Sequence, residues 1–376
     1  MRILIVQRSL SPPGGGNAVA AWMVHALARD HEVATLTARR WSPSATNAFY
    51  GTSIPDQGIT QHVLPAPWSW LDRLDEERAV RLRMGALLRH AKPLTPAYQL
   101  LITADNFGAF TKPGMQYVHF PAAITPKPAR LAPIVNLYFK FCEALMGLPW
   151  SAAAHNLTLA NSQWTAAGLR RDHGIGAHVL YPPVVDPGEG LPWEQRSDTF
   201  LCIGRFTASK RIEMAMSIVR RLRAHTLPRA RLIIVGSPVD REYTSRLRSQ
   251  AARAGDWIEF REDPSREHTN QLIGSCRYGV QAMVGEHFGM ATAELAKGGC
   301  LVFAHDSGGT PEVLGEPALL WKTEDDAVQR VSALTREAAT REAIRSRLRR
   351  HARAFTADRF CSELRQLAEG WVVQEL

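Results

Sequence analysis

Residues 200–204 read Phe-Leu-Cys-Ile-Gly and are followed directly by Arg205, and this short apolar run restarts a pattern already seen at the N-terminus. The earlier run extends from Ile3 to Val6. After each start, short runs rich in branched side chains alternate with longer segments of helical spacing. Such alternation is typical of parallel β-sheets covered by helices on both faces. The sequence therefore predicts an α/β protein with two Rossmann-like domains.

The expected strands and helix follow from this alternation. Parallel sheets of this kind bind ligands at the carboxyl ends of their strands, so polar motifs just after a strand are candidates for function. A helix is expected at 18–29, where apolar side chains recur every three or four residues. The expected strands of the first half are 3–6, 33–36, 100–103, 116–119 and 157–160. Those of the second half are 200–204, 232–236, 258–260, 279–283, 301–303 and 318–320.

The domain boundary is expected in the segment 181–187, which contains three prolines. Proline removes a backbone donor and prevents a continuous helix. A chain of 376 residues also exceeds the usual size of one compact core. We therefore expect an N-terminal domain over 1–186 and a C-terminal domain over 187–359.

Composition excludes several protein classes. Hydrophobic residues make up 45% of the chain and charged residues 22%, which are ordinary values for a globular protein and exclude a disordered chain, a collagen and a coiled coil. The longest nearly apolar stretch, 131–150, contains Lys140 and Glu143, so no transmembrane helix is expected. The N-terminal apolar run is too short for a secretory signal. Five scattered cysteines without a CxxC pair indicate a reducing cytoplasm.

The net charge of +9 is unevenly distributed along the chain. The segment 330–359 holds nine arginines and three acidic residues. A basic helix of this kind either contacts an anionic membrane peripherally, at the inner face, or is simply a solvated helix. Arg130, with the mostly apolar segment behind it, is a second candidate for membrane contact, although a buried helix of the first domain is the favoured interpretation of that segment. No nucleic-acid-binding motif accompanies the charge, so nucleic acid is not an expected partner.

The strongest functional motif is the segment 286–294, which follows the expected strand 279–283. It places Glu286 in a loop and Glu294 about one turn into a helix, with Phe288, Gly289 and Met290 between them as further candidate binding residues. A helix start suits a phosphate, and carboxylates accept hydrogen bonds from paired sugar hydroxyls. The spacing suits the two hydroxyl-bearing ends of a nucleotide sugar. Two solvated acids near a helix start are the simpler alternative.

A second motif, 204–210, follows the expected strand 200–204. Arg205 and Lys210 lie five residues apart across a strand-to-helix loop, so both can reach one anion. A diphosphate leaving group gains negative charge as its bond to the sugar breaks, and fixed cations stabilise that charge. A loop Arg and Lys are often only solvated, so this motif is weaker by itself.

Three further segments lie at expected strand ends. The glycine run 14–16 includes Gly15 and Gly16 and opens the first helix, where backbone can approach a ligand closely or form a plain flexible loop. It is neither GxGxxG nor a P-loop. Ser307 and Gly309 follow the strand 301–303 and can present backbone N–H groups to a diphosphate. His119 ends the strand 116–119 and is either structural or directed at the ligand.

Together these motifs resemble the GT-B glycosyltransferases of family GT4. The resemblance covers most of the chain and is densest from Asn161 to Val313. Local patterns at 119–121, 181–183 and 286–289 are similar to those of lipid-linked oligosaccharide mannosyltransferases that use GDP-mannose. The resemblance implies two Rossmann-like domains with parallel sheets facing a central cleft. It also implies that the last helix, 360–376, crosses back to the first domain.

The resemblance also implies a role for each candidate residue. Glu286 would hold hydroxyls of the donor sugar, and Glu294 those of the ribose. Arg205 and Lys210 would neutralise the diphosphate. His119 would face the reacting side of the sugar. Backbone at Gly15, Gly16 and Gly309 would assist with the diphosphate.

The implied activity is retaining transfer of a sugar from GDP-mannose or a UDP-sugar to a hydroxyl of a glycan, lipid-linked or small-molecule acceptor. The family implies no cofactor and no metal, and a protein base is not required because the leaving phosphate takes the proton. Two alternatives remain open from the sequence. One is a GT-B nucleotide-sugar epimerase, which would use the same diphosphate contacts without an acceptor. The other is a non-catalytic nucleotide-sugar-binding protein.

Overall fold

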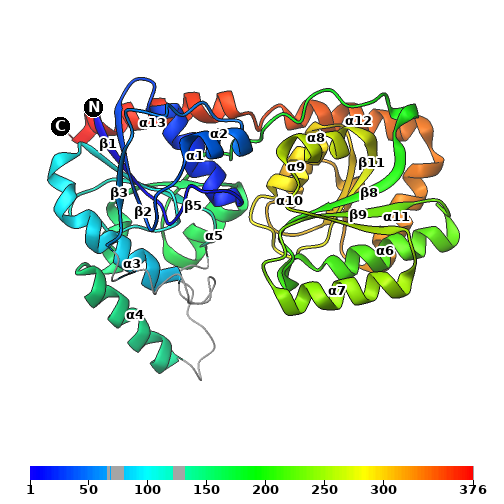
Figure 1. Ribbon diagram of the computed structural model, residues 1–376, viewed down its shortest axis with the longest axis horizontal. Coiled ribbons are helices and arrows are strands. Elements are labelled where there is room, and N and C mark those ends of the chain that lie inside the picture. The colour runs from blue at the N-terminus through cyan, green and yellow to red at the C-terminus, as the bar shows by residue number, and fades with distance from the viewer. Residues whose placement is uncertain (66–67, 69–79, 122–131, 376) are drawn as a thin grey trace. The chain divides into compact units, whose positions relative to one another are not determined.

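The computed structural model describes residues 1–65, 68, 80–121 and 132–375. Its residues fall into two compact units, Met1–Pro183 with Ala357–Leu376, and Val184–Thr356 (Figure 1). The sequence places the domain join after Asp186 and the returning helix from Phe360, whereas the two units divide after Pro183 and again after Thr356. The candidate membrane residue Arg130 lies outside the described residues.

The first unit is built on a parallel sheet whose described strands are ordered β3-β2-β1-β4-β5-β6-β7. The central strand β1 pairs in parallel with both β2 and β4, so Ile3 lies beside Val33 on one side and Leu100 on the other. The Ile3–Val6 side chains are completely buried, as expected for a strand covered on both faces. Its strands are β1 (Arg2–Val6), β2 (Glu32–Thr37), β3 (Thr60–Val63), β4 (Leu100–Thr103), β5 (Met115–Val118), β6 (Leu157–Ala160) and β7 (His178–Val179).

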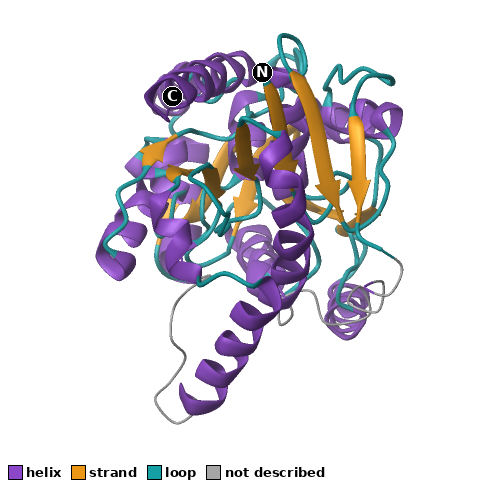
Figure 2. Cartoon of the chain, turned by 90° about the vertical axis from the view of Figure 1, so that its left-hand side faces the viewer, coloured by secondary structure: helices purple, strands orange, loops and turns teal. Residues whose placement is uncertain are grey.

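Helices lie on both faces of this sheet (Figure 2). The helix α5 shows why its residues form a helix: the Ser162 hydroxyl accepts a hydrogen bond from the Thr165 N–H at the start, and Gly174 ends it in the left-handed conformation. The C-terminal helix α13 packs on α1 in this unit. The helices are α1 (Gly15–Leu27), α2 (Pro43–Tyr50), α3 (Val80–Ala91), α4 (Ala132–Met146), α5 (Gln163–His173) and α13 (Ala357–Glu375).

The second unit repeats this plan with a parallel sheet of described strands ordered β10-β9-β8-β11-β12-β13. The Phe200 ring on the central strand stacks on Tyr278 of the neighbouring strand at a centroid distance of 4.7 Å. The strands are β8 (Ser197–Ile203), β9 (Arg231–Gly236), β10 (Ile258–Glu262), β11 (Cys276–Gln281), β12 (Leu301–His305) and β13 (Leu320–Trp321). The helices are α6 (Ile212–His225), α7 (Arg241–Ala254), α8 (Arg266–Ser275), α9 (Met290–Lys297), α10 (Thr310–Leu314), α11 (Glu324–Arg336) and α12 (Ala338–Ala352).

The fold class is confirmed: the protein is α/β with two parallel sheets. The expected strand 318–320 is wrong, because Pro317–Leu319 form a 3-10 turn and β13 begins only at Leu320. Strands β3 and β7 were not expected from the sequence. That the two sheets face a central cleft stays a prediction.

The strand order identifies the place in each sheet where a ligand is expected. In each sheet the order reverses next to the first strand of the unit, between β1 and β4 in the first and between β8 and β11 in the second. At such a switch point the loops leave in opposite directions and open a crevice at the carboxyl ends of the strands. The site residues are therefore sought in the loops that follow these four strands.

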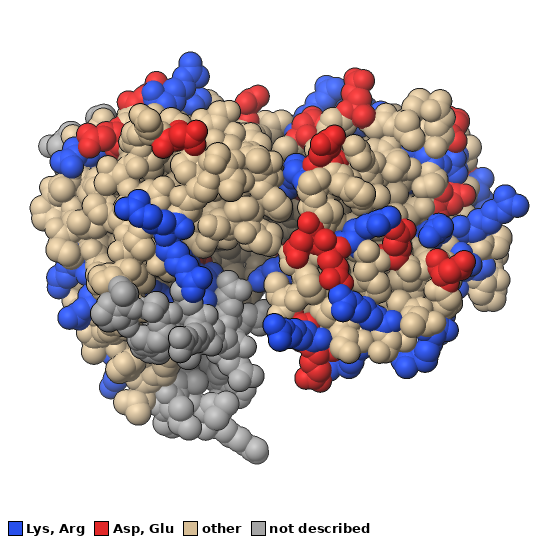
Figure 3. Space-filling view, in the orientation of Figure 1, with Lys and Arg blue, Asp and Glu red and all other residues tan. Residues whose placement is uncertain are grey.

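Several arginines of the basic segment 330–359 make contacts inside the second unit. The Arg345 guanidinium lies 4.2 Å from the centre of the Trp193 ring, and Arg347 forms an ion pair with Glu316 at 2.7 Å. Arg330 pairs with Asp326. On the face drawn in Figure 3, basic and acidic side chains of this unit are interspersed. These contacts tie part of the segment into the packed second unit, whereas Arg349, Arg350 and Arg353 are exposed, and contact with an anionic membrane stays a prediction.

Candidate functional site

The centre of the candidate site in the second unit is an ion pair across the switch point. Lys210 lies in the loop after β8, and Glu286 lies in the loop after β11. The Lys210 Nζ donates to Glu286 Oε2 at 2.5 Å, and both side chains are about one-fifth exposed. The structure thus brings together two of the residues that the sequence predicted to share a ligand, although they are 76 positions apart.

The Glu286 carboxylate is held in its ionised form. Burial alone raises its pKa, but the Lys210 ammonium and its hydrogen bond oppose this, with help from His287, and the resulting pKa lies below the ordinary 4.5. Glu286 is therefore an acceptor of hydrogen bonds at neutral pH. Lys210 supplies a cation whose position is fixed by this ion pair at the switch point.

The loop carrying Arg205 is fixed on both sides of that residue. The Gly204 N–H donates to the Val235 carbonyl at 2.9 Å, and the buried Phe206 donates its N–H to Ser237 at 2.8 Å. Between these anchors Arg205 is exposed. A Cβ added to Gly204 would lie 3.4 Å from Lys210 Cδ, so the lysine chain runs alongside this part of the loop.

The backbone N–H groups of Ser307 and Gly309, which the sequence suggested for a diphosphate, are already hydrogen-bonded within the protein. The Gly309 N–H donates to the Glu286 carbonyl at 2.7 Å, and the Ser307 N–H donates to His305 at 2.8 Å. The Ser307 hydroxyl accepts from the Gly285 N–H at 2.7 Å. Both residues are therefore used within the protein, where they hold the loop that carries Glu286.

Glycine is required at this junction because the two loops touch. A Cβ at Gly308 would lie 2.1 Å from the Glu286 carbonyl oxygen, and one at Gly309 would lie 2.4 Å from that of His287. Real Cβ contacts of this length do not occur, so a larger residue forces the loops apart. The glycines of this segment thus position Glu286, a role the sequence reasoning missed.

The residues between the two glutamates have different roles. The Phe288 ring is buried and packs edge-on against Phe355 at 5.3 Å, so its side chain anchors the loop in the core, and a contact of this residue with a ligand stays a prediction. Gly289 adopts a left-handed φ of 98° and caps α9. Met290 is the first residue of that helix, where backbone N–H groups lack helical partners. Gly289 and Met290 thus lie at the start of α9, and a contact of either with a ligand stays a prediction.

Glu294 is almost buried and forms an ion pair that the sequence did not reveal. It is 8% exposed, and its Oε1 lies 3.2 Å from a guanidinium nitrogen of Arg266. Arg266 is the first residue of α8, after the loop that follows β10. The sequence around Arg266 predicts a helix start capped by Ser265, but it does not indicate that Arg266 pairs with Glu294, 28 positions away.

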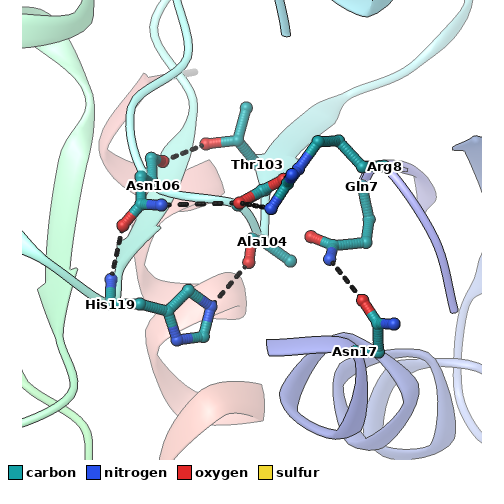
Figure 4. Close-up of polar contacts among 8 residues, drawn as sticks. Gln7, Arg8, Asn17, Thr103, Ala104, Asn106 and His119 are labelled. Atoms are coloured by element: carbon teal, nitrogen blue, oxygen red, sulfur yellow. Dashed lines mark hydrogen bonds and ion pairs between the residues drawn. The ribbon is translucent and has the colours of Figure 1, made fainter. Parts of the chain in front are cut away.

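In the first unit, His119 lies at the carboxyl end of β5 beside the switch point (Figure 4). Its Nε2 donates to the Ala104 carbonyl at 2.8 Å, and its backbone N–H donates to the Asn106 side-chain oxygen at 2.9 Å. Arg8, after β1, pairs with Asp105, after β4. This polar cluster was not predicted, apart from His119 itself, because its members come from three separate loops.

The glycine run lies against His119. A Cβ on Gly16 would lie 3.6 Å from His119 Nε2, while Gly15 begins α1. Asn17 closes the loop by donating to Ser11 at 2.8 Å, and it accepts a hydrogen bond from Gln7 at 3.2 Å. The structure therefore places two of the predicted residues, Gly16 and His119, next to each other.

Burial lowers the pKa of His119 below its ordinary 6.5, although the Ala104 carbonyl and Asp105 oppose the shift. Below pH 6.5 the unfolded chain takes up a proton that the folded protein does not, so the free energy of unfolding falls as the pH falls. We expect urea unfolding to show this loss between pH 7.5 and 5.5, and a smaller loss in His119→Gln. Equal losses in both proteins would contradict the assignment.

No group of three or more His, Cys, Asp or Glu side chains that would hold a metal ion occurs in residues 1–65, 68, 80–121 and 132–375. Among the same residues, no helix is long and apolar enough to cross a membrane. The five cysteines are buried and unpaired.

Comparison with known proteins identifies relatives of both sequence and fold. Residues 189–354 match the family model described as "Glycosyl transferases group 1". A GDP-Man:Man(3)GlcNAc(2)-PP-Dol alpha-1,2-mannosyltransferase of Dictyostelium discoideum is 28% identical over 180 residues, which is 42% of this chain and 35% of that protein. The human protein of the same description is 22% identical over 255 residues, covering 62% and 51%. The matches thus span about a third to a half of these curated relatives.

Solved structures match the whole fold at low identity. A sucrose-phosphate synthase from Thermosynechococcus elongatus superposes with a TM-score of 0.74 at 16% identity, and the match covers 99% of both chains. The glycosyltransferase WaaG, described as involved in lipopolysaccharide biosynthesis, gives a TM-score of 0.69 at 13% identity, with 98% of this chain and 100% of that chain covered. At these identities the likeness concerns the fold.

Proposed function

Because the chain belongs to the glycosyl transferases group 1 family and has the GT-B fold, we propose that it transfers a sugar from a nucleoside diphosphate sugar to an acceptor hydroxyl with retention of configuration. The observation that carries this proposal is the Lys210–Glu286 pair at the switch point of the second sheet. It places a cation for the diphosphate directly beside an ionised acceptor for sugar hydroxyls.

In the proposed reaction, Lys210 and Arg205 bind the diphosphate, Glu286 binds hydroxyls of the transferred sugar, and Glu294 binds the ribose. The bond between the sugar C1 and the phosphate oxygen breaks, and the acceptor oxygen bonds to C1 from the same face. The acceptor proton passes to the leaving phosphate oxygen. The cations stabilise the charge that develops on the diphosphate, which lowers the barrier more than it strengthens donor binding.

The cluster in the first unit suits the sugar side of the reaction. His119 is neutral at pH 7 because its pKa is lowered, and its Nε2 proton is held by the Ala104 carbonyl. Its Nδ1 is then an acceptor for a sugar hydroxyl. The buried side-chain oxygen of Gln7 accepts no hydrogen bond from the described residues and is a second acceptor beside the glycine run. We propose that this cluster binds hydroxyls of the transferred sugar or of the acceptor.

The proposed donor is GDP-mannose, with UDP-sugars as the alternative, and the proposed acceptor is a glycan, a lipid-linked or a small-molecule hydroxyl. GDP-mannose is favoured by the curated relatives, whose names describe GDP-Man-dependent mannosyltransferases. A thermal-shift panel of GDP, UDP, ADP and their sugar conjugates tests the base, because a ligand of the folded state raises its stability. We expect GDP-mannose to give the largest shift.

Replacing Glu286 by Ala should weaken discrimination among donor sugars more than affinity for free GDP. The carboxylate contacts sugar hydroxyls in this account, and a hydrogen bond to a charged group contributes about 1.5–3 kcal/mol. The measurement compares dissociation constants of GDP-mannose, GDP-glucose and GDP for the variant and the wild type. Equal losses for the three ligands would show that Glu286 does not read the sugar.

A further inference from the structure

Arg266 links the loop after β10 to the helix that carries Glu294. The loop itself is fixed near the end of the neighbouring strand: the Asp263 N–H donates to the Gly236 carbonyl at 3.1 Å, and the Ser237 hydroxyl donates to the Asp263 carboxylate. Arg266 follows three residues later and reaches Glu294 of α9. Arg266 therefore joins the structured segment after β10 to α9 through its contact with Glu294.

Because Glu294 is nearly buried, its carboxylate depends on the ion pair with Arg266. Its side chain is 10% exposed, and that of Arg266 is 22% exposed. An ionised carboxylate removed from water needs a nearby positive charge or hydrogen-bond donors. Glu294 is the fifth residue of α9, so the helix N-terminus lies more than a turn away and helps little. Arg266 supplies the charge.

We propose that Arg266 is a positioning residue for nucleotide recognition: it orients the Glu294 carboxylate so that this group accepts a hydrogen bond from a ribose hydroxyl. The inference rests on the proposed function, which assigns the ribose to Glu294. A carboxylate has two oxygens and about four acceptor sites, so it binds a guanidinium and a hydroxyl together. Arg266 thereby sets the discrimination between ribose and deoxyribose without contacting the reacting atoms.

A purely structural role of the ion pair predicts a different result. Breaking the pair would then change the stability of the second unit and would weaken the binding of all nucleotides equally. A positioning role instead changes the ratio of affinities for nucleotides that differ in one ribose hydroxyl. That ratio is unaffected by partial unfolding, because both ligands bind the same folded fraction.

The test uses Arg266→Gln in the full chain, with dissociation constants for GDP, 2′-deoxy-GDP and 3′-deoxy-GDP measured by calorimetry. In the wild type we expect loss of the contacted hydroxyl to weaken binding by about 10-fold, as for a hydrogen bond to a charged group. In Arg266→Gln this ratio should fall to about 2-fold, and Arg266→Lys should recover part of it. If UDP binds better than GDP, the same measurements are made with UDP, 2′-deoxy-UDP and 3′-deoxy-UDP.

The matched control is Arg246→Gln, which breaks an exposed ion pair with Glu242 within α7. It should keep the wild-type ratio. Combining Arg266→Gln with Glu294→Gln should reduce the ratio no further than either change alone, since both act on one contact.

The outcomes separate this inference from the proposed function. If Arg266→Gln binds GDP and keeps the wild-type ratio within 2-fold, the positioning role is overturned while nucleotide binding stands. If the wild type binds neither GDP nor UDP, the proposed function itself fails. If the wild type binds GDP and both deoxy analogues equally, Glu294 makes no contact with a ribose hydroxyl, and this inference is refuted.

Discussion

Lys210→Ala lowers kcat/KM for sugar transfer by about 100- to 1,000-fold in our account, the loss typical when one preorganised donor to a developing charge is removed. Among the site residues that the structure describes, only Lys210 has a side chain paired with the Glu286 carboxylate. Its removal would delete one of the two cations that we propose for the diphosphate. It also raises the pKa of Glu286, since the ammonium is the main group that holds this pKa low.

The control is Lys322→Ala, because Lys322 is an exposed lysine of the same unit whose partner is Asp306. It should transfer sugar at the wild-type rate. Steady-state kinetics on the two variants and on Arg205→Ala measure the effect, and thermal unfolding shows whether each variant is folded. Wild-type rates in both Lys210→Ala and Arg205→Ala would refute the diphosphate assignment.

Gly309→Ala is the second change with a large expected effect. The added Cβ would lie 2.4 Å from the His287 carbonyl oxygen, so the two loops must separate by about 1 Å to restore a normal contact. Displacement of a catalytic group by this distance lowers activity by about 100-fold. The backbone at Gly309 has an ordinary φ of −82°, so the effect comes from the contact and not from conformational strain.

The control for this change is Gly176→Ala, where the added Cβ meets no atom within 4 Å. Gly176→Ala should keep full activity. Gly309→Ala should also lower the free energy of unfolding by about 1–3 kcal/mol, as overpacking does. Wild-type kinetics in Gly309→Ala would mean that the loop carrying Glu286 is not held by this contact.

The sequence predicted the architecture well because it depends on a repeated local pattern. Buried parallel strands such as β1 and β9 are continuous apolar runs, and these stand out from the helical segments between them. The strand β3 was missed because its residues, Thr60 to Val63, are mostly polar and half-buried. The strand β7 has only two residues, which is too short for any periodicity.

The candidate site was predicted only in part, for a related reason. Motif spacing identified Lys210 and Glu286 separately, and the strand order brings them together. The roles of Ser307 and Gly309 were assigned to a ligand because a sequence does not show which N–H groups are already bonded within the protein. Arg266 has no motif at all, because its contact depends on two segments meeting in space.

The most direct test of the central claim is a crystal structure of the protein with GDP-mannose or with the nucleotide selected by thermal shift. Our account predicts diphosphate density within hydrogen-bond distance of the Lys210 ammonium and the Arg205 guanidinium, with a ribose hydroxyl at Glu294 and the sugar at Glu286. A bound nucleotide whose phosphates contact neither cation, and whose ribose and sugar lie away from both glutamates, would contradict it.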